Sequence, residues 1–198
     1  MAVYKLKVDA FADKFSEFIS DSNKNSLLIR GFYDVDKLLS VFNILNNNEH
    51  CHKGVIVLGN VTIKHEQELF QRIFRDKLPT FNLSDEFELA DLTVSFTKWE
   101  QNTEFFYGQS DDFTLFYPVE SVLFNAKDTA KFVKAVKKSK AKKNILITTN
   151  DFTKKAEKLY GIVDDCLILD TADVNEKHKK MFNTIEQNIK AEHNELPY

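Results

Sequence analysis

The stretch that decides the fold is Asn144–Asp170, which reads NILITTNDFTKKAEKLYGIVDDCLILD. Two apolar runs, Ile145–Ile147 and Cys166–Leu169, flank a short amphipathic segment that ends at Gly161. Both runs are apolar throughout, which is typical of strands that are buried on both faces of a parallel sheet. The stretch therefore predicts a strand, a helix and a second strand, with the two strands paired in parallel through a right-handed crossover. We expect four side chains of the helix to face the sheet: Phe152, Ala156, Leu159 and Tyr160.

The first eighty residues show the same alternation of strand and helix patterns. Strands are predicted at Val3–Val8, Ser26–Phe32 and Val55–Leu58. The segments between them carry apolar side chains at helical spacing. Strands that alternate with helices are the signature of a parallel α/β sheet.

The period changes between residues 81 and 124. Three short runs in this region favour strands: Phe87–Leu89, Leu92–Phe96 and Phe113–Tyr117. We expect them to form a strand-rich antiparallel insertion or extension of the sheet. Pro118 predicts that the third strand ends there or lies at an edge, because proline cannot donate a ladder hydrogen bond.

Together these patterns predict one α/β domain over residues 1–198. Its mostly parallel sheet is flanked by helices, with the strand-rich extension at 81–124 and a C-terminal helix at 174–195. A chain of 198 residues is long enough to bury one substantial core without disulfides or a metal.

Composition favours a cytoplasmic protein with no membrane association. The N-terminus lacks an apolar signal-peptide core, and no apolar run approaches the roughly 20 residues of a membrane helix. The two cysteines, Cys51 and Cys166, form no disulfide framework, and Cys166 is expected to be a buried free thiol. Abundant Lys, Asn and Phe suggest a bacterial, phage or plasmid genome rich in A and T.

Polar residues follow the predicted strands, where α/β proteins bind ligands. The candidate catalytic residues are Asp34, Asn150, Asp151 and Asp170. If the strands are parallel, these side chains share one edge of the sheet and could hold a divalent cation. The alternative is that each one caps a helix, since Asp and Asn are common at helix N-termini.

Common catalytic and cofactor motifs are missing from the sequence. It contains no GxGxxG, GxxxxGK[ST] or GxSxG pattern, so no organic cofactor is predicted. His50-Cys51-His52 is expected to be a loop and not a metal site, because adjacent residues do not converge on one tetrahedral ion. Asp111, Asp112 and Glu120 weakly resemble a carboxylate nuclease set, although the lysine that such a set requires is absent.

The charge is unevenly distributed along the chain. Residues 1–126 carry 12 basic and 19 acidic side chains, whereas residues 127–143 carry eight lysines and one acid. We expect a positive surface over two neighbouring helices, formed by Lys131, Lys134, Lys137, Lys138, Lys142, Lys143, Lys154 and Lys155.

Two functional hypotheses follow. The first is a non-catalytic binding module that meets a partner protein or a nucleic acid through the lysine cluster, or another copy of itself in a homo-oligomer. The second is a metal-dependent hydrolase, such as a nuclease, built on the carboxylates at the strand ends. The absence of a complete catalytic set favours the first.

Overall fold

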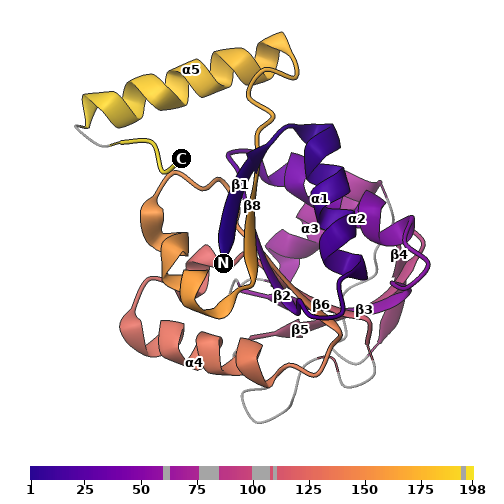
Figure 1. Cartoon of the computed structure of the whole chain (residues 1–198). Coiled ribbons are helices and arrows are strands. Elements are labelled where there is room, and N and C mark those ends of the chain that lie inside the picture. Colours follow the sequence, from indigo (N-terminus) through magenta and orange to yellow (C-terminus); the bar gives the residue numbers. More distant parts are fainter. Residues whose placement is uncertain (60–62, 76–84, 100–107, 109–110, 193–194) are drawn as a thin grey trace.

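The computed structural model describes residues 1–59, 63–75, 85–99, 108, 111–192 and 195–198. Strands and helices alternate along most of the chain (Figure 1). The elements, in order, are β1 (Ala2–Leu6), α1 (Val8–Ser20), β2 (Ser26–Arg30), α2 (Asp34–Asn46), β3 (Lys53–Leu58), α3 (Ile63–Phe74), β4 (Glu86–Leu89), β5 (Leu92–Lys98), β6 (Phe113–Tyr117), the 3₁₀ helix η1 (Glu120–Val122), α4 (Ala126–Lys138), β7 (Lys143–Ile147), the 3₁₀ helix η2 (Lys154–Ile162), β8 (Asp165–Leu169) and α5 (Glu176–Ala191).

The described strands form one sheet in the order β1-β8-β2-β7-β6-β3-β5-β4. Every neighbouring pair is parallel except β4 and β5. The predicted fold class is therefore confirmed: a mostly parallel sheet flanked by helices, with an antiparallel pair at one edge. The strand order in the sheet differs from the order in the sequence. β8 lies between β1 and β2, and β7 and β6 lie between β2 and β3.

Two apolar cores lie on opposite faces of the sheet, because successive strand residues point to opposite sides. On β2, Leu27 and Ile29 join the core beneath α1, α2 and α3, whereas Leu28 joins the core beneath α4 and η2. The same alternation recurs on β7, where Leu146 faces α4 and η2. Both faces are thus covered, which explains why the central strands are apolar at nearly every position.

The Asn144–Asp170 stretch folds as strand, helix and strand, but with two corrections. β7 and β8 are not paired with each other, because β2 lies between them and is parallel to both. The helix is a 3₁₀ helix, and it begins only at Lys154. Phe152 lies before it and is 39% exposed, so its predicted place in the core was wrong, whereas Ala156 and Leu159 are buried as predicted.

The antiparallel part of the 81–124 extension is narrower than predicted. Only β4 runs antiparallel to its neighbour, and it occupies the edge of the sheet. β6 is a central strand between β3 and β7, and it ends at Tyr117, directly before Pro118. Proline thus terminates the strand and does not mark an edge.

The C-terminal helix α5 stands apart from the sheet (Figure 1). It spans Glu176–Ala191 where 174–195 was predicted, and none of its residues is buried. The Tyr33 hydroxyl donates to the His178 carbonyl at 2.7 Å, and the Phe32 ring lies 5.3 Å from the Phe182 ring. Among the described residues, no helix is both long enough and apolar enough to span a bilayer.

Candidate functional site

The carboxyl ends of the parallel strands share one edge of the sheet, as the sequence predicted. At this edge β2 and β7 are neighbours, yet their chains leave toward opposite faces, β2 into α2 and β7 toward η2. Such a divergence opens the crevice in which α/β proteins usually bind ligands. The first candidate site therefore consists of the residues that line this divergence.

Lys37 lies at the centre of the divergence and is almost fully buried. Its Nζ donates to the carbonyls of Gly31 and Thr149, each at 2.6 Å, and so joins the ends of β2 and β7. Gly31 has φ of 149°, and a Cβ there would lie 2.7 Å from the Leu169 carbonyl oxygen. Only glycine suits this backbone conformation and this close approach.

Burial lowers the pKa of Lys37 to about 8, because the charged ammonium is deprived of water. The nearby carboxylates of Glu120, Asp34 and Asp151 act in the opposite direction. Lys37 is therefore a buried cation surrounded by acids, which the sequence patterns did not reveal.

Glu120 and Asp151 each leave one carboxylate oxygen without a partner. Glu120 Oε1 accepts from the Thr149 amide at 2.7 Å, while its Oε2 is buried and has no hydrogen bond. Asp151 Oδ2 accepts from Arg30 Nε at 2.5 Å, while its Oδ1 is likewise buried and unpartnered. Burial raises the pKa of both carboxyl groups above the ordinary values.

Arg30 is held in an aromatic and polar cage. Its guanidinium donates to the Tyr160 hydroxyl at 2.6 Å and to the Thr153 carbonyl at 3.2 Å, and it lies 4.9 Å from the centre of the Tyr198 ring. Burial opposes the charge, but the hydrogen bonds and charges of Asp151 and Tyr160 together outweigh burial, so the pKa of Arg30 is raised. Arg30 therefore remains charged and neutralises Asp151.

The four candidate catalytic residues do not form one cluster. Asp34 and Asp151 both act on Lys37. Asp34 and Asn150 line a pocket of about 410 Å³ beneath α5. Its other lining residues are Tyr33, Val35, Asp36, Lys177, His178 and Met181. Asp170 lies apart, where its carboxylate meets Lys7 Nζ at 3.2 Å.

A metal centre is not assembled from these groups. Within the part of the chain that the structure describes, no set of three His, Cys, Asp or Glu side chains is placed to hold a metal ion. Arg30 and Lys37 already supply positive charge to the buried acids. Asp111 and Asp112 precede β6 whereas Glu120 follows it, so the weak nuclease set is divided between opposite edges of the sheet.

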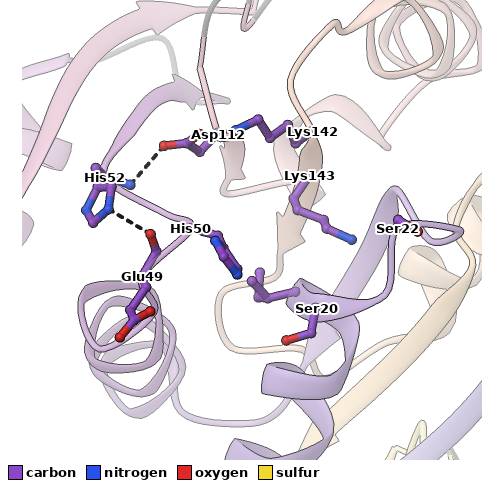
Figure 2. Close-up of a pocket in the computed structure, with 9 residues that line it drawn as sticks. Ser20, Ser22, Glu49, His50, His52, Asp112, Lys142 and Lys143 are labelled. Atoms are coloured by element: carbon purple, nitrogen blue, oxygen red, sulfur yellow. Dashed lines mark hydrogen bonds and ion pairs between the residues drawn. The ribbon is translucent and has the colours of Figure 1, made fainter.

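The amino-terminal edge carries a larger pocket of about 550 Å³ (Figure 2). His50 and His52 from the predicted loop line it, together with Asp112. Two polar contacts lie within it: His52 Nε2 meets the Glu49 carbonyl at 2.8 Å, and Asp112 pairs with Lys142 at 2.7 Å. His52, Asp112 and Lys142 are thus engaged with other groups of the pocket.

Lys143 was wrongly assigned to the positive surface. It is buried at the start of β7, and its Nζ donates to the carbonyls of Phe18, Asp21 and Lys24 at 2.8, 2.6 and 2.6 Å. It thereby satisfies the Phe18 carbonyl in the last turn of α1, which has no partner within the helix, and two carbonyls of the segment that follows α1. Lys142 is exposed, but it lies at the amino-terminal edge, where it pairs with Asp112 and lines the pocket described above, so it too is not part of the surface described next.

The remaining lysines form a second candidate site on the face that α4 and η2 cover. We call it the lysine face, and it consists of the exposed Lys127, Lys131, Lys134, Lys137, Lys138, Lys154, Lys155 and Lys158. α4 is in contact with η2, so both helices contribute to this face. Lys154 meets Glu195 at 3.3 Å, whereas Lys131, Lys134 and Lys137 form no ion pair with any described residue.

One aromatic side chain on the lysine face was missed by the sequence analysis. Phe124 precedes α4 and is 70% exposed, more than any other large apolar residue of the described chain. Lys155 Nζ lies 4.4 Å from the centre of its ring. The only signal in the sequence was a phenylalanine immediately before the helix-capping Asn125.

Comparisons with known proteins add little. Scans against protein-family models and against curated proteins found no match. One solved structure, the "Crystal structure of the C-terminal part of Fun30 ATPase domain", aligns with 94% of this chain and 54% of its own at 16% identity, with a TM-score of 0.30. The chain thus spans about half the length of that structure.

Proposed function

We propose that this protein is a non-catalytic binding module whose lysine face contacts the phosphates of a nucleic acid. The observation that carries the proposal is that Lys131, Lys134 and Lys137 are exposed and form no ion pair with any residue the structure describes. Ammonium groups without a carboxylate partner are available to replace the counterions around a phosphate backbone.

The helical spacing gathers these charges on one side. Lys127, Lys131 and Lys134 are four and then three residues apart, so they form a stripe along α4. Phe132 and Val136, on the other side of the helix, are buried against the sheet. At a rise of about 1.5 Å per residue, the stripe from Lys127 to Lys134 covers roughly 10 Å.

The attraction is local, because the chain as a whole carries a net charge of −3. A concentrated positive patch on an acidic protein can orient a polyanion toward one surface. Lysine carries a point charge without the planar fork of arginine, which suits phosphate contact better than the reading of base edges. We therefore expect binding that depends strongly on salt and weakly on nucleotide sequence.

The test compares two variants that each reverse three charges. Lys131→Glu, Lys134→Glu and Lys137→Glu alter the lysine face, whereas Lys177→Glu, Lys179→Glu and Lys180→Glu alter α5, at the opposite end of the molecule (Figure 1). Binding of a labelled oligonucleotide is measured by fluorescence anisotropy over a range of salt concentrations. The wild type should show a log–log salt slope of several units, and the face variant should flatten it by about two units or more.

The α5 variant should bind nearly as well as the wild type, because it has the same net charge as the face variant but keeps the lysine face. Equal losses in both variants would show that only net charge matters and would contradict the proposal. Failure of the wild type to bind at low salt would contradict it as well.

A hydrolase is the second candidate, favoured by the unpartnered oxygens of Glu120 and Asp151 at the carboxyl edge. Carboxylate oxygens are the ligands that Mg²⁺ and Mn²⁺ prefer. This candidate requires a thermal shift with either ion and cleavage of DNA or RNA, both reduced by Glu120→Gln. If neither ion changes the unfolding temperature and neither DNA nor RNA is cleaved, the hydrolase proposal is rejected.

A further inference from the structure

We infer that Phe124 stacks on a nucleobase, so that the nucleic acid bound by the lysine face is single-stranded. This inference rests on the proposed function and specifies its ligand. A single exposed apolar side chain is common on protein surfaces and needs no explanation by itself. What distinguishes Phe124 is where it lies and how firmly its backbone is held.

The residues on both sides of Phe124 are fixed. Leu123 is fully buried, and its carbonyl accepts from Lys158 Nζ at 2.8 Å. Asn125 caps α4, since its side chain accepts from the Asp128 amide at 2.8 Å. The chain therefore presents the Phe124 ring to solvent from a well-anchored backbone, and the exposure does not come from a frayed end.

Positive charge lies close to the ring. Lys155, from η2, places its Nζ 4.4 Å from the ring centre. Lys127 begins the α4 stripe three residues after Phe124. One acid is nearby, because Asp128 lies in the first turn of α4, but the Asn125 side-chain amide donates to it.

An exposed ring among lysines matches single-stranded nucleic acid in two respects. Unpaired bases expose their faces and stack on aromatic side chains, while the neighbouring phosphates meet the lysines. In a duplex the faces of the bases are covered by their neighbours, so Phe124 would have nothing to stack on. A ring of this kind also tolerates any base, in agreement with the weak sequence dependence expected above.

The test uses Phe124→Ala and Phe124→Trp, with Phe152→Ala as the control. Phe152 is also a partly exposed phenylalanine, but it packs on Phe32 outside the lysine face. Four probes are compared by anisotropy or competition: an oligothymidylate, a duplex of the same length, heparin and poly-glutamate. Heparin carries negative charge without bases, and poly-glutamate stands in for an acidic protein.

Phe124→Ala should weaken oligothymidylate binding about 5- to 150-fold, the range that corresponds to a stacking contribution of about 1–3 kcal/mol. Heparin and duplex binding should change little, and Phe152→Ala should match the wild type. Phe124→Trp should restore oligothymidylate binding, and the fluorescence of the new tryptophan should be quenched by the oligonucleotide. The native Trp99 is buried and supplies a constant background.

An unchanged affinity for oligothymidylate in Phe124→Ala would overturn the inference, and so would an equal loss for heparin. If poly-glutamate binds as tightly as oligothymidylate and is equally weakened, the ring serves an acidic protein partner and the inference fails. If heparin and duplex binding depends on the lysines but no probe is affected by Phe124→Ala, the proposed function is supported and the inference about Phe124 fails. A wild type that binds none of the probes would overturn both.

Discussion

Arg30 Nε lies 2.5 Å from Asp151 Oδ2, and the two side chains expose 0% and 1% of their surface. The pair joins the end of β2 to the segment after β7, where the two chains leave the sheet toward opposite faces. A buried ion pair is not in itself a strong source of stability, but removing one partner leaves an uncompensated charge in the interior.

Asp151→Asn should therefore destabilise the protein by about 3–5 kcal/mol, because Arg30 would keep its charge without a counterion. The matched control is Asp170→Asn, the same chemical change after β8, where Asp170 meets the exposed Lys7. That change should cost less than about 1 kcal/mol. Urea denaturation of both variants checks the prediction, and equal losses would contradict it.

Lys37 and Glu120 should be energetically coupled, because each partly compensates the buried charge of the other. Lys37→Met should cost about 1–3 kcal/mol, because it leaves the buried carbonyls of Gly31 and Thr149 without their donor. Glu120→Gln added to Lys37→Met should recover part of this loss, with a coupling energy of about 1–3 kcal/mol. A double-mutant cycle of unfolding free energies measures the coupling, and strict additivity would disprove it.

The architecture could be predicted from the sequence, whereas the strand order could not. Runs such as Ile145–Ile147 are apolar at every position, which indicates a strand covered on both faces, and the structure agrees. Such a run does not indicate which strand lies beside it, so the position of β2 between β7 and β8 could not be predicted. Long-range packing determines which strands pair in a sheet, and the local periodicity of the sequence carries no information about that packing.

The site was only partly predictable for a related reason. The rule that ligands bind at strand ends selected Asp34 and Asp151, and the charges of both act on Lys37. Lys37 was missed because lysine was assumed to lie at the surface, although it stands four residues before the buried Val41, on the core side of α2. The same assumption placed the buried Lys143 on the positive surface. The sequence shows that a lysine is charged, but whether its side chain is buried depends on which carbonyls the ammonium group can reach.

Stability should depend on pH through Lys37. Its pKa is about 8 in the folded protein and near 10.5 in the unfolded chain. Between these values the unfolded state binds more protons, so stability rises with pH in this window, by at most about 3 kcal/mol. The difference in unfolding free energy between the wild type and Lys37→Met should therefore grow in favour of the wild type from about pH 8 to pH 10.5. A difference that stays constant over this range would refute the assignment.

Tyr198 should stabilise the cage around Arg30. Its ring lies 4.9 Å from the guanidinium, and its hydroxyl donates to the Asp151 carbonyl at 3.3 Å. Tyr198→Phe removes only the hydrogen bond and should cost about 0.5–1.5 kcal/mol. Tyr198→Ala also removes the ring above a buried cation and should cost about 2 kcal/mol more. Thermal unfolding of the two variants separates the contributions, and equal losses would show that the ring contributes nothing.

Both cysteines should be unreactive until the protein unfolds. Cys51 and Cys166 are buried free thiols, and burial raises their pKa values to about 11 and about 12. The thiolate is the reactive species, and the raised pKa values make its population at neutral pH very small. The reagent must also reach the buried sulfur.

Ellman's reagent should modify neither thiol in the native protein and both in guanidinium chloride, where the stoichiometry serves as the control. Cys166 lies on β8 between two paired strands, so any labelling of the native protein over long times should require global unfolding, and the logarithm of its rate should rise in Asp151→Asn in proportion to the lost stability. Rapid labelling of either thiol in the native wild type would show that its strand opens without global unfolding, and would contradict the burial on which both cores depend.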